Sequence, residues 1–325
     1  MKAMVVRDYG GPEVLRLEDL PSPDVPADHV KVRVRACGVN FADTLLIRGQ
    51  YQVKPDFPFS PGLEVAGEII EAGAGVSWLK AGQRVLAITG YGGYAQEVVV
   101  PGRAATPIPD TMDDKSAAAF AVAYGTSHLA LDHKAGLKAG EVLLVHGASG
   151  GVGLTAVEIG KHMGATVIAT ASTMDKLNVA KCKGADHLIL SSAEDMREQI
   201  KALTKGKGAD VIYDPVGGDL AKTSLRAINF EGRYVVIGFA SGTIPQFPAN
   251  IVLVKNIDVM GLFWGAYATK RPEIMSQSLQ TLLGWYENGA LRPHISHTYA
   301  LADAADAMTL MLERKSTGKI VIEVG

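Results

Sequence analysis

Cysteine is scarce in this sequence, since Cys37 and Cys182 are the only two among 325 residues. Two thiols cannot build a disulfide framework or a four-cysteine structural zinc site, and each is expected to pack as a small buried apolar group. Lysine and arginine (32) nearly balance aspartate and glutamate (34), so the net charge is only −2. That balance predicts no nucleic-acid partner and no anionic membrane surface.

Long apolar runs are also missing. No stretch approaches the roughly 20 apolar residues of a membrane-spanning helix, and the opening "MKAMVVRDYG" lacks the apolar core of a signal peptide. We therefore expect a cytoplasmic protein. The hydrophobic content of 47% is ordinary for a globular chain, and 325 residues are enough for two domains.

The first 120 residues are expected to be rich in β-strand. Apolar and polar residues alternate over 29–39, 64–76 and 82–88, and the segment 92–109 continues this pattern of half-buried strands. Glycine and proline separate the runs. One helix is predicted at 41–49.

Strand and helix signals alternate after residue 115. An alanine-rich helical stretch (114–137) is followed by predicted strands at 141–147, 166–171, 187–192, 209–216 and 232–240, with helices at 153–164, 173–184, 193–206 and 220–228 between them. Such alternation indicates parallel strands with helices on both faces, a doubly wound sheet. Helices at 272–289 and 302–315 and a strand at 318–324 follow. This C-terminal segment is expected to return to the first domain.

The stretch "VLLVHGASGGVG" (142–153) joins the first of these strands to its helix. Ala148, Gly150 and Gly153 stand at the three small-residue positions of a dinucleotide-binding loop, whose first position is usually glycine. Gly150 lets the backbone approach a pyrophosphate, and Gly153 lets the helix pack closely on the strand. The alternative is a tight turn without a ligand. The predicted cofactor contacts here are Ala148, Ser149, Gly150, Gly151, Val152 and Gly153.

The end of the second predicted strand favours NADPH over NADH. An NAD site usually carries an acidic residue there, which binds the ribose 2′-hydroxyl. This chain has Ser172 and Thr173, followed by Lys176, and hydroxyl donors with a positive charge suit a 2′-phosphate. A helix N-cap role for the hydroxyls is compatible with this reading. Asp175 would favour NADH if it pointed inward.

Several separated motifs resemble the zinc-independent NADPH:quinone oxidoreductase branch of the medium-chain dehydrogenase/reductase superfamily. They are residues 1–51, "FPFSPGLEVAGEIIEAGAGV" and "VHGASGGVG", and the resemblance spans nearly the whole chain. It implies an α/β protein: a GroES-like β-rich catalytic domain (1–120 and 266–325) and a Rossmann domain with a doubly wound parallel sheet (121–265), with the active site between them. Where the zinc enzymes have a Cys and a His ligand, this chain has Asn40 and Leu63, so no metal is expected. Glu64 remains there without ligand partners.

The resemblance implies hydride transfer from NADPH to a small-molecule quinone or an activated alkene. An oxyanion would develop and need donors, and Asn40, Asp43 and Tyr51 are the candidate catalytic residues. Tyr51 lies where related enoyl reductases carry a proposed proton donor. Each also has a structural interpretation: a turn for Asn40, a helix turn for Asp43 and a surface aromatic for Tyr51. The further cofactor contacts implied are Thr126, Ser191, Gly238, Phe239, Ser241, Phe263, Trp264, Gly265 and Lys319.

Two other functions stay open. A 2-enoyl thioester reductase would need a deep apolar slot for an acyl chain, and an NADPH-binding structural or regulatory protein would show no turnover. Histidines 128, 133, 146, 162, 187, 294 and 297 show no metal-ligand spacing and are expected to be structural. The sheet is expected to end near 232–240 or 256–263, and pairing of that edge across a two-fold axis predicts a homodimer.

Overall fold

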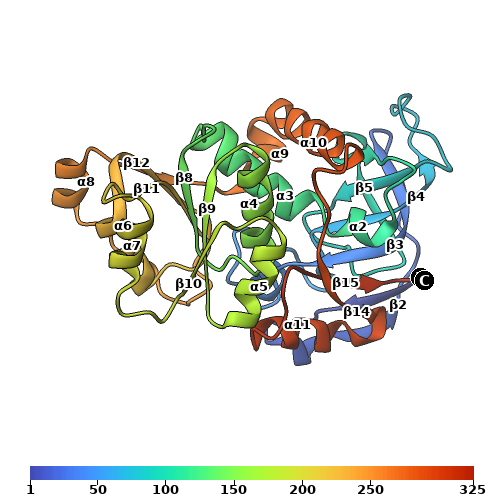
Figure 1. The fold of residues 1–325 in the computed structure, drawn as a ribbon. Helices are drawn as coiled ribbons and strands as arrows, with labels where there is room; N and C mark the ends of the chain where they lie inside the picture. The colour runs from blue at the N-terminus through green and yellow to red at the C-terminus, as the bar shows by residue number, and fades with distance from the viewer. The chain divides into compact units, whose positions relative to one another are not determined.

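The computed structural model describes residues 1–325, which form two compact units (Figure 1). Unit 1 comprises residues 1–122 and 283–325, and unit 2 comprises residues 123–282. The boundaries thus fall inside helix α3 (Ala121–His128) and helix α10 (Pro272–Glu287), and the second one lies later than the expected 265/266. None of the helices combines the length and the apolar character needed to cross a membrane.

Unit 1 is built on a seven-stranded sheet. Its order is β14-β15-β3-β4-β5-β7, and β6 also pairs with β3. The strands are β3 (His29–Val39), β4 (Glu64–Ala72), β5 (Arg84–Ile88), β6 (Glu97–Pro101), β7 (Ala105–Pro107), β14 (Ile295–Ala300) and β15 (Lys319–Glu323). Because β15 pairs antiparallel with β3, the C-terminal segment lies in the same sheet as the N-terminal strands. A separate hairpin joins β1 (Lys2–Val5) to β2 (Arg16–Asp19).

The pattern of β3 explains its place in the middle of this sheet. Val30, Val32 and Val34 are fully buried at alternate positions, as expected when one face of a strand covers a core. Helix α11 (Ala304–Leu312) contributes Ala307 and Met308 to the same core. The remaining helices of unit 1 are α1 (Phe41–Leu46), α2 (Asp114–Ala118) and the short 3₁₀ turns η1 (Pro12–Val14), η2 (Gly102–Ala104) and η5 (Leu301–Asp303).

Unit 2 contains a six-stranded sheet in the order β10-β9-β8-β11-β12-β13, and every pairing in it is parallel. The strands are β8 (Val142–Val145), β9 (Thr166–Ala171), β10 (His187–Leu190), β11 (Ala209–Asp214), β12 (Ile228–Val236) and β13 (Asp258–Gly261). Numbered along the chain, this is the 3-2-1-4-5-6 order of dinucleotide-binding folds, in which ligands bind beyond the carboxyl ends of the strands. The doubly wound sheet predicted from the sequence is confirmed.

Helices connect these strands. They are α4 (Gly151–His162), α5 (Met174–Cys182), α6 (Met196–Leu203), α7 (Asp219–Ala227) and α8 (Ala249–Lys255). The 3₁₀ turn η4 (Trp264–Ala266) and helix α9 (Tyr267–Lys270) follow the last strand, β13. The sequence did not predict α8 or β14. The single helical stretch expected at 114–137 is divided instead into α2, α3 and a π-helical turn, η3 (Leu129–Lys134).

Candidate active site

The glycine loop of unit 2 runs from the end of β8 to the start of α4. Gly150 is the N-cap of α4, and Gly147 turns the chain with a φ of +55°. A Cβ on Gly153 would lie 2.1 Å from the carbonyl oxygen of Gly147, so the helix can approach the loop only without a side chain there. A Cβ on Gly150 would meet nothing closer than 3.4 Å. Packing therefore requires Gly153, whereas Gly150 leaves space open beside the N-terminus of α4.

Ala148 stands at the first position of the fingerprint and anchors the loop. Its side chain is fully buried, and its N–H donates to the carbonyl of Thr170 at 2.9 Å, so the residue ties the loop to β9. The neighbouring Ser149 is also buried, while Gly151 and Val152 in the first turn of α4 are partly exposed. The free N–H groups of this first turn make it an anion site.

A buried polar network lies beside the loop. Nε2 of His146 is 2.6 Å from the Ser224 hydroxyl, and Nδ1 is 2.8 Å from the Thr170 hydroxyl. Because Ser224 donates to the carbonyl of Leu220, it accepts from His146, which places the proton on Nε2. Burial lowers the pKa of His146, so the ring stays neutral near pH 7. His146 thus has a structural role: its two hydrogen bonds link the end of β8 to β9 and to helix α7.

The residues predicted to select the nucleotide lie together at the ends of β9 and β10. Leu190 is in register with Ala171, so Ser191 and Ser172 follow neighbouring strand ends. Thr173 is the N-cap of α5, and its hydroxyl accepts from the N–H of Lys176 at 3.3 Å. Ser172 is exposed.

The loops after β11 and β12 pack on each other at the same edge. The buried carboxylate of Asp214 accepts from the N–H groups of Val216 and Gly217 at 2.8 and 2.9 Å, and from the hydroxyl of Tyr234. A Cβ on Gly217 would meet the ring of Phe239 at 3.3 Å. Gly238, Phe239 and Ser241, which follow β12, therefore lie at the carboxyl edge of the sheet, and Phe239 is exposed. Ser241 closes a local turn with Thr243.

Helix α3 meets the segment after β13. A Cβ on Gly125 would lie 2.7 Å from the ring of Trp264, so the helix can approach this ring only with glycine there. Thr126, the next residue of α3, and Trp264 are both buried. Phe263 is exposed, and Gly265 packs beside its ring. Sequence analysis missed Ser127, whose hydroxyl is 2.8 Å from both the carbonyl of Val152 and the hydroxyl of Thr155, joining α3 to α4. A single serine in an apolar helix gives no pattern to recognise.

Asn40, Glu64 and Lys319 form a buried polar network in unit 1. The Lys319 ammonium is 2.8 Å from Oε1 of Glu64, 2.7 Å from Oδ1 of Asn40 and 3.0 Å from the carbonyl of Val39. The Asn40 amide donates to Oε1 of Glu64 at 3.0 Å and to the carbonyl of Gly38 at 3.2 Å. We call these three side chains the Lys319 network. Within it Glu64, which has no metal-ligand partners, accepts hydrogen bonds from two side chains.

The Lys319 network bears on the roles predicted for Lys319 and Asn40. All three N–H bonds of the Lys319 ammonium have an acceptor, so the predicted phosphate contact would require those bonds to break. Both amide hydrogens of Asn40 are also engaged, which leaves none for a substrate oxyanion. The structure favours a positioning role for both residues.

Asp43 is a second buried anchor of unit 1. Its carboxylate accepts from the N–H groups of Asn40 and Gly62 at 2.8 and 3.0 Å, which closes the capping box at the start of α1 and holds the loop before β4. Burial raises the pKa of Asp43 to about 7, while these bonds and the charge of Lys319 act in the opposite direction. Because its side chain is fully buried, Asp43 positions the backbone rather than touching a substrate.

Tyr51 is half-buried and packs against the core of unit 1. Burial, with a smaller contribution from the charge of Asp43, raises the pKa of its phenol to about 12. The phenol is therefore protonated at neutral pH and can act as a donor. Leu63 is buried at the position where the zinc relatives have a ligand, and no group of three or more His, Cys, Asp and Glu side chains in the chain could hold a metal ion.

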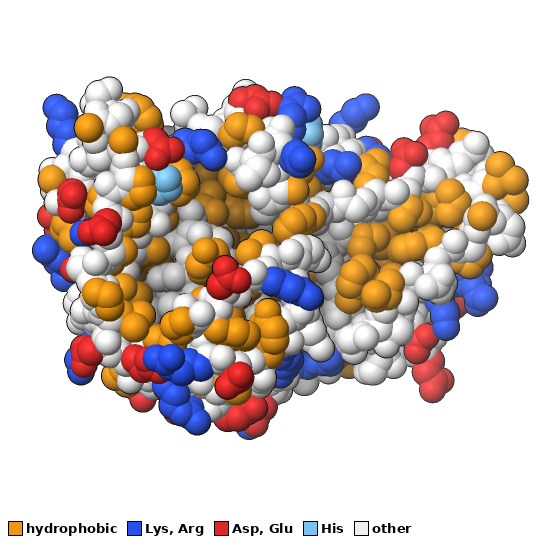
Figure 2. All heavy atoms as spheres, turned by 180° about the vertical axis from the view of Figure 1, so that it is seen from behind, with side chains coloured by type: hydrophobic (Ala, Val, Ile, Leu, Met, Phe, Trp, Pro, Cys, Tyr) orange, Lys and Arg blue, Asp and Glu red, His pale blue; other side chains and the backbone are white.

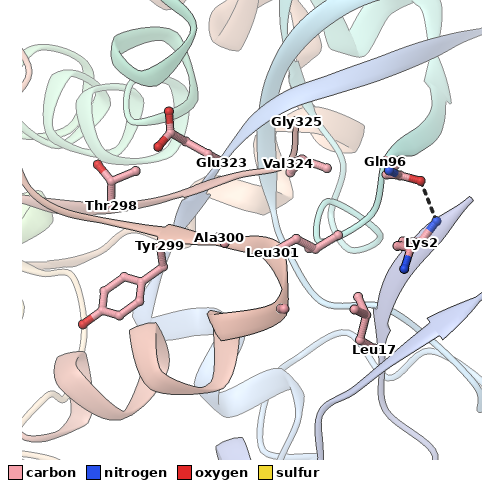
Figure 3. A pocket seen from close by; sticks show the side chains of 11 residues that line it. Lys2, Leu17, Gln96, Thr298, Tyr299, Ala300, Leu301, Glu323, Val324 and Gly325 are labelled. Carbon is pink, nitrogen blue, oxygen red and sulfur yellow. Dashed lines mark hydrogen bonds between the residues drawn. The ribbon is translucent and has the colours of Figure 1, made fainter.

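A surface pocket of about 420 Å³ lies elsewhere in unit 1, between β14, the end of β15 and β1 (Figure 3). Its lining includes Lys2, Tyr299 and Glu323. Glu323 is at the opposite end of β15 from Lys319, about 13 Å along the strand. None of the predicted site residues lines it, so the chemistry of the candidate site does not lie there.

Comparison with known proteins agrees with this architecture. Residues 26–110 match the alcohol dehydrogenase GroES-like domain, and residues 151–283 match the zinc-binding dehydrogenase domain. A GroES-like unit and a Rossmann unit in one chain define a medium-chain dehydrogenase/reductase.

Individual relatives narrow the class. Quinone oxidoreductase-like protein 2 homolog from Nematostella vectensis is 40% identical over 99% of this chain and 88% of its own length. Human quinone oxidoreductase is 34% identical over 99% and 97%. The Escherichia coli quinone oxidoreductase structure, complexed with NADPH, superimposes with a TM-score of 0.91 at 30% identity and covers both chains completely. The chain belongs to the quinone oxidoreductase family.

Proposed function

We propose that this protein is a reductase that binds NADPH and delivers hydride to a quinone or to the C=C bond of an α,β-unsaturated carbonyl compound. The observation that carries the proposal is the open space at Gly150, beside the N-terminus of α4 and at the switch point of the parallel sheet. The NADPH bound to the E. coli relative supports it. When bound, the reduced nicotinamide supplies the hydride.

The chain's own residues would hold and select the nucleotide. The first turn of α4 supplies N–H donors for the pyrophosphate, and the hydroxyls of Ser172 and Thr173 with the ammonium of Lys176 suit a 2′-phosphate. Lys176→Ala should therefore weaken NADPH binding by about tenfold, equivalent to about 1.4 kcal/mol, and leave NADH binding nearly unchanged. Equal losses for both nucleotides would contradict the 2′-phosphate assignment.

Residues of unit 1 would serve the acceptor. Hydride addition to an enone leaves an enolate, which must take a proton, and Tyr51 carries a phenolic proton held at neutral pH. Asp43 and the Lys319 network hold the backbone of residues 38–46 that leads to it. These residues position the segment.

The proposal is tested by following NADPH absorbance with 1,4-benzoquinone, 9,10-phenanthrenequinone, 2-alkenals and crotonyl-CoA, each also with NADH. Turnover of quinones or alkenals supports the reductase. Preference for crotonyl-CoA would identify an enoyl thioester reductase instead. NADPH binding without turnover of any acceptor would refute the enzymatic proposal and leave a binding protein.

We further propose a homodimer joined through the free edge of β13. This strand pairs only with β12, and Val259 on it is 37% exposed. Figure 2 shows apolar side chains gathered over the part of unit 2 that carries α8, where Leu253 and Val254 are about three-quarters exposed. Val259→Lys should lower the mass in light scattering to that of a monomer, whereas Trp78→Lys, at an exposed site in unit 1, should not. The cytoplasmic location stays a prediction.

A further inference from the structure

The place of Lys319 in the fold is set by strand register. Ile320 is paired with Val39 in the antiparallel contact between β15 and β3, so Lys319 comes beside the end of β3 and the following Asn40. Cys37 is paired with Val65 in the contact between β3 and β4, which brings Glu64 opposite Gly38. Three segments that are far apart in the sequence therefore deliver a cation, an anion and an amide to one buried point.

The charges and hydrogen bonds at this point are complete. The ammonium of Lys319 pairs directly with the carboxylate of Glu64, and the two side chains are 5% and 1% exposed. Asp43 is the second buried carboxylate nearby; burial raises its pKa, and the charge of Lys319 opposes that effect. The second carboxylate oxygen of Glu64 accepts from the N–H of Val122 at 2.8 Å, in the first turn of α3. A buried ion pair is tolerable when its remaining donors and acceptors are satisfied in this way.

Gly38 gives the carboxylate its space. A Cβ there would lie 2.7 Å from Oε1 of Glu64 and 2.2 Å from the carbonyl oxygen of Ala118. The backbone thus closes tightly around the ion pair.

We propose that Lys319 is an internal counter-ion and positioning residue. With Glu64 it fixes the amide of Asn40, the N-cap of α1 and the first turn of α3, and it does not bind a cofactor phosphate. The inference rests on the proposed function only where it assumes that the segment after Asn40 contacts the quinone or enone that accepts the hydride. A lysine that binds a cofactor phosphate would be expected to have its ammonium accessible to solvent. The ammonium of Lys319 is instead enclosed by three protein oxygens.

The experiment uses K319M, K319R, E64Q and the double variant K319M/E64Q. For each we would measure the NADPH dissociation constant by fluorescence titration, the urea midpoint of unfolding, and kcat and KM for a quinone. K115M is the matched control, because Lys115 also pairs with a glutamate of β15, Glu323, at 2.8 Å, but both side chains are about half exposed.

NADPH affinity should stay within about twofold of wild type in every variant, because no ammonium is withdrawn from the nucleotide. K319M and E64Q should each lower the urea midpoint, since each leaves one buried charge unpaired, and K319M/E64Q should unfold at a higher midpoint than either. K319M should raise KM for the quinone, and K319R, which keeps the charge, should restore part of it. K115M should change none of these values.

An NADPH dissociation constant raised about tenfold in K319M, with an unchanged midpoint, would overturn the proposal in favour of a phosphate ligand. A double variant as unstable as the sum of the single variants would also overturn it. If K319M alone does not fold, E64Q and the double variant still decide the pairing. If wild-type protein binds NADPH but reduces no quinone, the proposed reaction fails while affinities and midpoints still test Lys319.

Discussion

Gly150 and Gly153 look equivalent in the fingerprint, but replacing each with alanine is expected to affect a different property. Alanine at Gly150 should weaken nucleotide binding, and alanine at Gly153 should lower the free energy of unfolding. A Cβ on Gly153 would lie 2.1 Å from a backbone oxygen, against an ordinary contact distance of 3.4 Å, so loop and helix must separate. A Cβ on Gly150 reaches 3.4 Å and fits the folded protein, but it fills the space next to the free N–H groups of α4. The first glycine therefore serves the ligand and the second serves the fold.

Gly160 provides a matched control within the same helix. Its Cβ would lie 2.4 Å from Cδ2 of Leu143, the end of a flexible side chain. Each helical alanine gains about 1 kcal/mol in propensity over glycine, and overpacking costs roughly 1–3 kcal/mol. Gly160→Ala should therefore be close to neutral. Gly153→Ala brings the new Cβ against a backbone oxygen, so the overpacking cost should lie at the upper end of that range and leave a net loss of about 2 kcal/mol.

Urea unfolding and NADPH fluorescence titration separate the two effects. Gly150→Ala should keep the wild-type midpoint and weaken NADPH binding by about tenfold or more. Gly153→Ala should lower the midpoint, and Gly160→Ala should alter neither quantity. If Gly150→Ala binds NADPH as tightly as wild type, the loop does not hold the pyrophosphate.

Three other outcomes follow from the site. Tyr51→Phe should slow enone reduction at least tenfold and quinone reduction little, because an enolate is a stronger base than a hydroquinone anion; equal rates would remove the donor role. Burial raises the pKa of Asp43 to about 7, above its unfolded value. The folded protein should therefore lose stability as pH rises from about 4 to 7, by on the order of 4 kcal/mol at most. In Asp43→Asn the urea midpoint should no longer fall over this pH range. Burial lowers the pKa of His146, so the free energy of unfolding should drop as pH falls below about 6.5. His146→Gln should make this drop smaller. An unchanged drop in the variant would show that protonation of His146 does not cause it.

The elements predicted best are those whose burial pattern is regular. Strand β3 has the predicted bounds 29–39, and β9 has the predicted bounds 166–171. Helix α8 has no buried residue, and β14 has only exposed and half-buried ones, so neither shows an apolar periodicity. Both were missed for that reason.

The candidate site also contains residues whose position the sequence predicts and residues whose position it does not. The residues of unit 2 follow the ends of consecutive parallel strands, and local sequence is enough to place them there. Lys319 and Glu64 are separated by 255 residues, and their contact depends on which strand β15 pairs with and in which register. No local pattern encodes that register, so the sequence around Lys319, the first residue of β15, does not reveal its contact with Glu64.

The hydrogen bonds distinguish residues that hold the site from those that can meet a ligand. In the Lys319 network every side-chain donor has a protein acceptor, and both ring nitrogens of His146 have hydroxyl partners. Fully satisfied buried groups resist reorientation, and a ligand that recruited them would have to break existing bonds. Ser172 instead is exposed, and the space beside Gly150 at the start of α4 is open. Binding energy for the nucleotide should therefore come from the groups the fold leaves unsatisfied, while the buried networks keep those groups in place.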